Sequence, residues 1–507
     1  MLFFNYNSSA AQTLKEINGS FKDPEVAYLV KKGLDESYNF NWTESEKTFR
    51  LLISKYPESP VGYHFLSGIY MWYFLGNQNE NDFNRFIEIS DSAILKFNEI
   101  VDSLPPDFEL LYIMGANYSY RAIVYAKNSN YLDAIWSTTK TESFLAECIR
   151  INPEYYDAYL GLGLYNFAIS QIPAAFRWAL NLAGIEGDYK TGIKYIRLTA
   201  NKGVYSKTDA QYYLSQILSD VYLDYTEANK YLAPLASRYP GNLLFNYALA
   251  SLRIKEHNPK AAGRLLSGII KQNTSRFSNL INLARFLQGD VYFKLNDFKS
   301  AINYYSDFLS DYKGKDYRGI AALRLGISYE MLGLRDSAEL YYSQSGEGNL
   351  DIEDDVYAAG IGEIYLSNPV TEIRKRTIFA SNLIEAGEYR KATDSLLILL
   401  ETDSLNEAKA LINYYLSEAY FYQKKYDDCI LHAFTTVGYP GDYENWIYPF
   451  AYYNTAKAYL KQKNYTDCLR NLEAAGDYND YYYQNKLENL LSNLKGKLET
   501  LAPELFN

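Results

Sequence analysis

The chain has 507 residues, 48% of them hydrophobic and 22% charged, a composition typical of neither a disordered chain nor a membrane-embedded one. Fifty basic against sixty-one acidic residues give a net charge of −11 with no long basic run, which argues against nucleic acid as the principal ligand. Only three His and three Cys are present, so no metal site, cofactor or disulfide framework is predicted.

Residues 1–20 are predicted to be a flexible N-terminus or the remnant of a signal segment. A secretory signal begins with basic residues and continues with about 7 to 15 apolar ones. Here Met1-Leu2-Phe3-Phe4 is short, and no basic residue precedes Lys15. Ser9-Ala10-Ala11, however, has the small side chains of a cleavage site. Two compartments therefore stay open: the cytoplasm, or the periplasm and cell envelope if the signal peptide is truncated.

Signals of paired helices begin near the N-terminus and return along the chain. Gly33 is followed by Phe49 and Pro57, and a similar set of signals surrounds Gly163. Small residues recur near the start of each predicted second helix, with later spacings such as 34 (228 to 262) and 39 (262 to 301). The series reads Ser45, Gly192, Ala228, Ala262, Ala301, Ala338, Ala392, Cys429 and Cys468. Two antiparallel helices cross at these positions, where a larger side chain would push them apart.

Residues 169–187 are predicted to be an inserted helix. Pro173 suits the first turn and Gly184 the C-terminal stop, while Arg177 and Asn181, four residues apart, form a narrow polar stripe on an otherwise apolar helix. A membrane-spanning helix is excluded because a central Arg costs about 2.5 to 3.5 kcal/mol. Three alternatives stay open: a helix that caps the interior, a partner-binding or lid helix, and an interfacial membrane helix.

The clearest repeat lies in the middle of the chain. Leu287-Gln288-Gly289-Asp290-Val291-Tyr292 is followed by Ala301 and Tyr305, and the next unit repeats this order with Leu325-Gly326, Tyr329, Ala338 and Tyr342. These motifs resemble the tetratricopeptide-repeat family. The resemblance implies an all-α protein, a right-handed α-solenoid of about ten to eleven helical hairpins over residues 21–479. A capping helix and tail are expected over 480–507.

Two features interrupt the repeat in its second half. An extra helix is predicted at roughly 352–366, in the wider gap between Ala338 and Ala392. Before it, Glu347 to Asp355 is the densest acidic stretch and lacks the residue order of a calcium loop. Acids at a helix N-terminus, or weak cation binding, would explain it.

The family resemblance also implies which residues face the groove, at the second, fifth, ninth and twelfth positions of each first helix. Aromatic side chains interleaved with single charges would suit a partner that is partly apolar and partly basic. The candidate partner-binding residues chosen from these positions, to which Trp178 of the insert is added, are Phe286, Asp290, Phe293, Tyr414, Glu418, Phe421, Tyr453 and Lys457. The same side chains could equally be packing residues.

No nucleotide-binding loop, nucleophile elbow or zinc motif occurs, so no enzymatic activity is predicted. The number of carboxylates leaves one enzymatic alternative open, a glycan hydrolase with paired Asp or Glu residues. The sequence predicts a scaffold or adaptor that binds protein or peptide partners through the groove, with no integral membrane segment. The alternative is a carbohydrate-binding or glycan-handling envelope protein that uses its 53 tyrosines.

Overall fold

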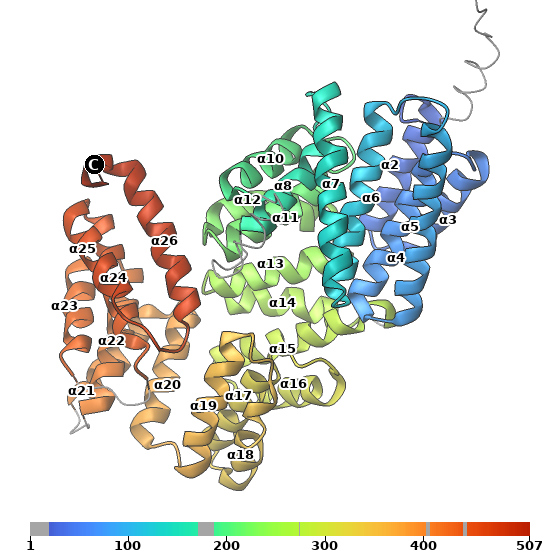
Figure 1. Cartoon of the computed structure of the whole chain (residues 1–507). Helices are drawn as coiled ribbons and strands as arrows, with labels where there is room; N and C mark the ends of the chain where they lie inside the picture. The colour runs from blue at the N-terminus through green and yellow to red at the C-terminus, as the bar shows by residue number, and fades with distance from the viewer. Residues whose placement is uncertain (1–19, 171–186, 273, 402–405, 440–443, 507) are drawn as a thin grey trace, which may run out of the picture. The chain divides into compact units, whose positions relative to one another are not determined.

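The computed structural model describes residues 20–170, 187–272, 274–401, 406–439 and 444–506. Within these ranges every regular element is a helix, as the sequence predicts (Figure 1). The α-helices are α2 Pro24–Tyr38, α3 Trp42–Lys55, α4 Pro60–Asn77, α5 Glu80–Val101, α6 Phe108–Lys127, α7 Tyr131–Ile151, α8 Ala158–Ser170, α10 Tyr189–Lys202, α11 Lys207–Asp220, α12 Tyr225–Arg238, α13 Leu243–Lys255, α14 Pro259–Ile270, α15 Ser278–Lys294, α16 Phe298–Asp311, α17 Arg318–Met331, α18 Arg335–Tyr342, α19 Glu353–Ser367, α20 Glu372–Glu385, α21 Tyr389–Glu401, α22 Asn406–Tyr422, α23 Tyr426–Val437, α24 Ile447–Lys461, α25 Tyr465–Gly476 and α26 Gln484–Leu501. Short 3-10 turns are η1 Ser275–Phe277, η2 Ser345–Glu347 and η3 Pro503–Phe506.

The described residues form two compact units. Unit 1 takes those up to 218 together with 226–246 and 274–280, and unit 2 takes 219–225, 247–272 and those from 281 onward. Unit 1 therefore contains α2 to α8 and α10, and unit 2 contains α14 and α16 to α26.

The two helices of a hairpin cross at the small residues that the sequence identified. Each member of the series from Ser45 to Cys468 is the fourth residue of its second helix, and each is buried. Glycine often faces it from the first helix: a Cβ at Gly326 would lie 2.5 Å from the ring of Tyr342 and 3.1 Å from the carbonyl oxygen of Ala338. A side chain at either position would separate the helices.

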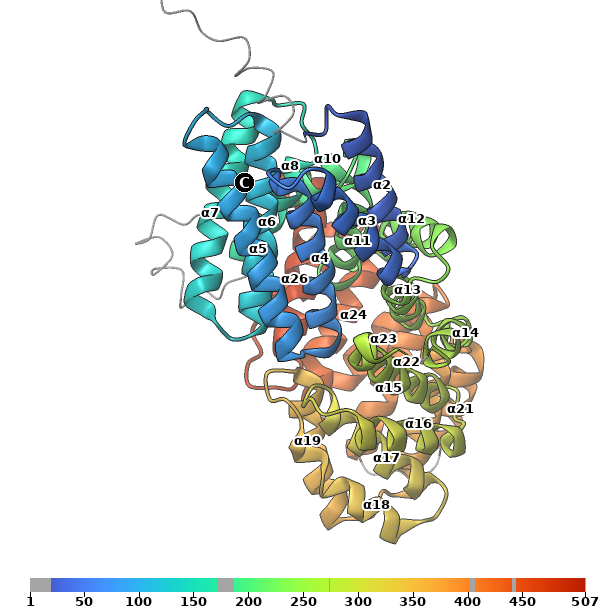
Figure 2. The same cartoon turned by 90° about the vertical axis from the view of Figure 1, so that its right-hand side faces the viewer.

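The first helices of successive hairpins form the inner layer of each unit. In unit 1, α2 contacts α4, α4 contacts α6 and α6 contacts α8; in unit 2, α20 contacts α22 and α22 contacts α24. The second helices make no comparable contacts with one another in the described part of the chain. Figure 2 shows α4, α5 and α6 side by side in unit 1. Crowding of the first helices and spreading of the second ones gives an array its concave face.

Eight hairpins share one turn. A residue with positive φ follows the first helix, and the next N–H donates to the carbonyl five residues earlier, as in Asp297 to Tyr292, which is a Schellman motif. The residues with positive φ are Phe40, Ser129, His257, Asn296, Gly333, Gly387, Lys424 and Lys463. Only two are glycine, the residue that adopts this conformation without strain.

Unit 2 contains two helices without a hairpin partner. α19 occupies the position of the predicted extra helix and packs against α17. α26 contacts α24 and α25, and Leu487 near its start is buried with Leu411 and Phe450. The predicted capping helix thus begins at Gln484 and packs along the first helices as well as against the last hairpin.

We expect opposite effects from adding a methyl group at two glycines. Gly333 has a φ of 77° and open space around its Cβ position, so Gly333→Ala should lower the free energy of unfolding by about 1–2 kcal/mol through backbone strain alone. Gly496 also has open space but lies inside α26, so Gly496→Ala should raise it by about 0.5–1 kcal/mol. Urea unfolding followed by circular dichroism measures both. Equal signs for the two variants would refute the assignment of the turn.

Candidate binding surfaces

Four of the groove positions predicted from the sequence lie together in unit 2. They are Glu418 and Phe421 on α22 and Tyr453 and Lys457 on α24, and we call them the α22–α24 face. The Lys457 ammonium lies 4.5 Å from the ring centroid of Phe421 and 4.9 Å from that of Tyr453. All four side chains are half-buried. Two aromatic rings therefore hold a lysine in place by cation–π attraction while part of it stays accessible.

The two charges of the α22–α24 face are incompletely compensated. Burial raises the pKa of Glu418 to about 7, although the nearby Lys457 opposes the shift. Burial likewise lowers the pKa of Lys457, although Glu418 opposes it. Among the described residues neither side chain takes part in an ion pair. An oppositely charged group of a partner could therefore still form an ion pair with either side chain.

A neighbouring carboxylate shows the contrast. Glu385 on α20 forms an ion pair with Lys294, and His257 Nε2 lies 4.0 Å from it. Burial disfavours the ionised Glu385, but Lys294 and His257 outweigh burial and hold its pKa at about 2. The hydroxyl of Tyr389 lies 3.2 Å from His257 Nδ1. This cluster contains an ion pair, whereas Glu418 forms none with any residue that the structure describes.

The other predicted positions within the described residues are buried in the packing of unit 2. The ring centroid of Phe286 lies 5.4 Å from that of Phe308, and Phe293 contacts Phe298 edge-on. Asp290 accepts hydrogen bonds from Tyr305 and from Arg324, whose Nη1 lies 2.6 Å away.

Tyr414 is also buried, with only 4% of its surface exposed. The position of a residue in a first helix therefore does not tell whether its side chain faces the groove or is buried between neighbouring first helices. Trp178 and nearly all of the predicted insert lie outside the described residues.

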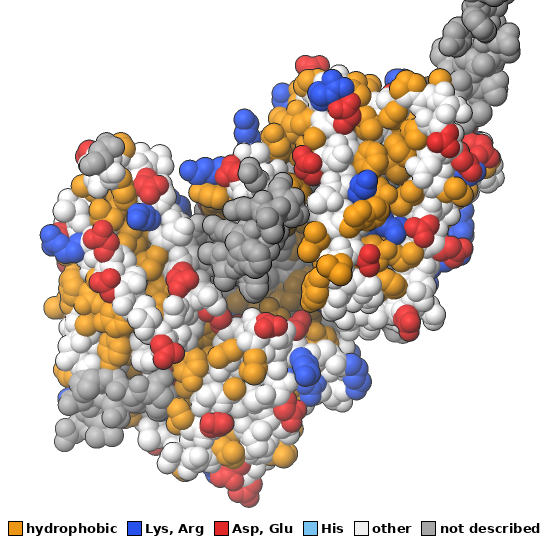
Figure 3. Space-filling view, in the orientation of Figure 1, with side chains coloured by type: hydrophobic (Ala, Val, Ile, Leu, Met, Phe, Trp, Pro, Cys, Tyr) orange, Lys and Arg blue, Asp and Glu red, His pale blue; other side chains and the backbone are white. Residues whose placement is uncertain are grey.

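A second surface was missed in the sequence. On α7, Leu132 is 85% exposed and Trp136 50% exposed, and Tyr131 and Ile135 beside them are also exposed. The signal in the sequence is a pair of consecutive apolar residues repeated four positions later, which places all four residues near one face of a helix. Over the face of the molecule in Figure 3, acidic and basic side chains are interspersed, and apolar side chains reach the surface between them. Contiguous exposed apolar groups of this kind mark interaction sites.

The acidic stretch caps helices that are distant in sequence. Asp355 accepts hydrogen bonds at 2.9 Å from the N–H groups of Tyr317, Ile320 and Asn349. Glu353 accepts from the N–H groups at the start of α26, at 2.9 and 3.2 Å. These acids accept hydrogen bonds at helix N-termini. The sequence predicted acids at a helix N-terminus but did not identify which helices they would contact.

The described residues contain no group of three or more potential metal ligands among His, Cys, Asp and Glu. In the same ranges no helix has both the length and the apolar character that a membrane span requires.

Comparison with known proteins agrees with the repeat geometry. The family model described as tetratricopeptide repeat matches residues 286–348, the segment around the crossing of α15 with α16 and of α17 with α18. Residues 286–348 thus match a tetratricopeptide repeat, and every regular element of the residues that the structure describes is a helix.

Two solved structures are similar to it. The crystal structure of the P58(IPK) TPR domain is 16% identical, with a TM-score of 0.22 over 83% of this chain and 99% of that one. The crystal structure of the APC/C hetero-tetramer Cut9-Hcn1 is 15% identical, with a TM-score of 0.24 over 93% and 96%. A search of curated protein sequences gives no match.

Because Phe286 fills the core between α15 and α16, Phe286→Ala should lower the free energy of unfolding by about 3–5 kcal/mol. Phe421→Ala, at a half-buried position, should cost clearly less. Denaturant unfolding of both variants provides the measurement. A Phe286 variant of normal stability would show that its ring is not a core element.

Removing the Asp355 carboxylate should leave three backbone N–H groups without their acceptor. Asp355→Ala is therefore expected to lower the free energy of unfolding by about 2 kcal/mol or more. Asp351→Ala is the matched control, since Asp351 is exposed, and should change it by less than about 0.5 kcal/mol. If calcium ions stabilised the wild-type chain and not Asp355→Ala, the stretch would be a cation site instead.

Proposed function

We propose that the protein is a non-enzymatic scaffold that binds protein partners, and that the α22–α24 face is one of its recognition surfaces. The tetratricopeptide repeats support a protein-interaction role in general, because arrays of this kind present extended inner surfaces. The observation that carries the choice of surface is a half-buried lysine held between two rings beside a half-buried carboxyl, with neither group in an ion pair with a described residue.

The chemistry of this face favours a partner segment that combines basic and apolar side chains. Glu418 would take the basic group, and Phe421 and Tyr453 offer apolar contact area. Because its pKa lies at about 7, Glu418 gains charge as the pH rises through neutrality, so binding of a basic segment should strengthen in that direction. The exposed apolar residues of α7 provide area for a second contact.

The carbohydrate alternative has no specific observation in its favour. Tyr305 and Tyr342 cover glycines of the facing helix, and Tyr329 and Tyr341 stack on each other with centroids 5.5 Å apart. Rings engaged in this way are not free to stack on a sugar.

Affinity capture from native cells, followed by mass spectrometry, tests the proposal. The double variant Glu418→Gln/Lys457→Met removes both charges, and Lys461→Met/Glu473→Gln makes the same changes at exposed positions of α24 and α25. We expect stoichiometric partners to be lost by the first variant and kept by the second. When the wild-type capture is repeated at about pH 6, recovery of these partners should fall, because Glu418 is then mostly protonated.

Circular dichroism must first show that both variants fold as the wild type does. If the two variants retain the same partners as the wild type, the α22–α24 face is not the recognition surface. If no stoichiometric partner is captured by any of the three proteins, the scaffold function itself is contradicted.

A further inference from the structure

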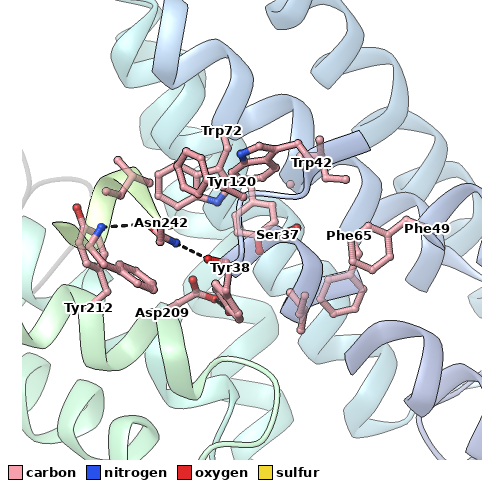
Figure 4. A pocket seen from close by; sticks show the side chains of 16 residues that line it. Ser37, Tyr38, Trp42, Phe49, Phe65, Trp72, Tyr120, Asp209, Tyr212 and Asn242 are labelled. Carbon is pink, nitrogen blue, oxygen red and sulfur yellow. Dashed lines mark hydrogen bonds between the residues drawn. The ribbon is translucent and has the colours of Figure 1, made fainter. Parts of the chain in front are cut away.

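Unit 1 contains two adjoining cavities of about 50 and 60 Å³. Both are lined by Trp72 of α4, Tyr120 of α6 and Asp209 of α11 (Figure 4). A buried water needs about 10–15 Å³ of such space, so each cavity has room for about four water-sized groups. Three first helices therefore surround a hollow that a small ligand group would fill.

Of the two carboxylate oxygens of Asp209, one accepts a hydrogen bond from a described residue and the other accepts none. The Tyr38 hydroxyl donates to Asp209 Oδ2 at 2.8 Å, and the backbone of Tyr38 is in turn fixed by Asn242 Nδ2, which donates to its carbonyl oxygen at 2.9 Å (Figure 4). Asp209 Oδ1 accepts no hydrogen bond from any described residue, and Asp209 forms no ion pair with one. One carboxylate oxygen is thus left for a ligand.

No cation among the described residues balances this carboxylate. The residues that line the two cavities include no Lys, Arg or His. The titratable groups that face Asp209 are the phenols of Tyr38, Tyr112, Tyr120, Tyr212 and Tyr213 and the carboxyl of Asp157. Burial raises the pKa of Asp209 to about 6, so the group is mainly anionic at pH 7.

The second carboxylate in the hollow is already satisfied. Asp157 accepts hydrogen bonds from the N–H groups of Val204, Tyr205 and Ser206 at 2.7 to 2.9 Å, at the start of α11. Its role is to hold that turn. Asp209 is therefore the carboxylate available to a ligand, in a wall made of aromatic rings.

We propose that this hollow binds an alkylammonium group, with its nitrogen at Asp209 Oδ1 and its methylenes against Trp72 and Tyr120. An ammonium is a compact charge that one oxygen and nearby ring faces can satisfy. A guanidinium prefers two carboxylate oxygens, and Tyr38 already occupies one of them.

Two sources carry this group: a free alkylamine, and the lysine side chain of a protein segment. The site lies in unit 1 and rests on contacts independent of the α22–α24 face, so its failure would leave the proposed function standing.

Isothermal titration of the full chain with n-butylammonium chloride tests the proposal, with n-butanol as the neutral counterpart. We expect saturable binding of the ammonium at pH 7.5 and binding of butanol about tenfold or more weaker. Acetyl-Gly-Lys-Gly-amide distinguishes the sources. Tighter binding of this peptide than of n-butylammonium assigns the hollow to lysine side chains, and weaker binding assigns it to free amines.

Asp209→Asn removes the charge and keeps an acceptor for Tyr38, and it should weaken binding of n-butylammonium about tenfold or more. Asp336→Asn, at an exposed position of α18, should leave binding unchanged. If Asp209→Asn fails to fold, Ala116→Leu fills the second cavity and should also abolish binding.

Wild-type affinity should rise between about pH 5 and about pH 7, because Asp209 loses its proton there while an ammonium with a pKa near that of lysine, about 10.4, keeps its own. Equal affinity of the wild type and Asp209→Asn, equal affinity for butanol, or no measurable binding would each overturn the proposal.

Discussion

The close approach of two helices at one small residue is the constraint on which the hairpins depend. Among the described hairpins, the fourth residue of the second helix is Ser, Gly, Ala or Cys in ten, and the facing glycine often lies beneath an aromatic ring. Because a Cβ at Gly289 would lie 2.7 Å from the Tyr305 ring, the ring itself fills the space that a side chain would take. This explains part of the tyrosine content as packing rather than as a binding surface.

The same constraint buries the first helices, since each lies between its own partner and its neighbours in the inner layer. A charge on such a helix must find compensation or remain costly. Asp290 is compensated by Arg324, and Glu385 is compensated by Lys294. Within the described ranges Glu418 and Asp209 form no ion pair, and both have raised pKa values. The distinction between structural and available carboxylates follows from these partners and not from the position of the residue in the repeat.

The sequence predicted the all-α fold, the crossing positions and the extra helix, because these depend on local spacing. Ala134, the fourth residue of α7, fits the same series, whereas α5 has Phe83 at the corresponding place and breaks the pattern. The roles of Phe286, Asp290 and Asp355 depend on contacts with other hairpins, and no residue spacing reports such contacts. Asp209 belongs to no motif, so only the assembled walls of the cavity identify it.

The contact between α26 and the start of α19 changes how unit 2 can come apart. A linear array of repeats has a free end, and mechanical load applied there removes one hairpin after another. In unit 2 the last helix is also held by Glu353, 132 residues earlier in the chain. Force on the C-terminus is therefore shared between the final hairpin and a helix in the middle of the array. The hydrogen bonds between Glu353 and the start of α26 therefore oppose the detachment of the terminal hairpins, although Glu353 belongs to neither of the last two hairpins.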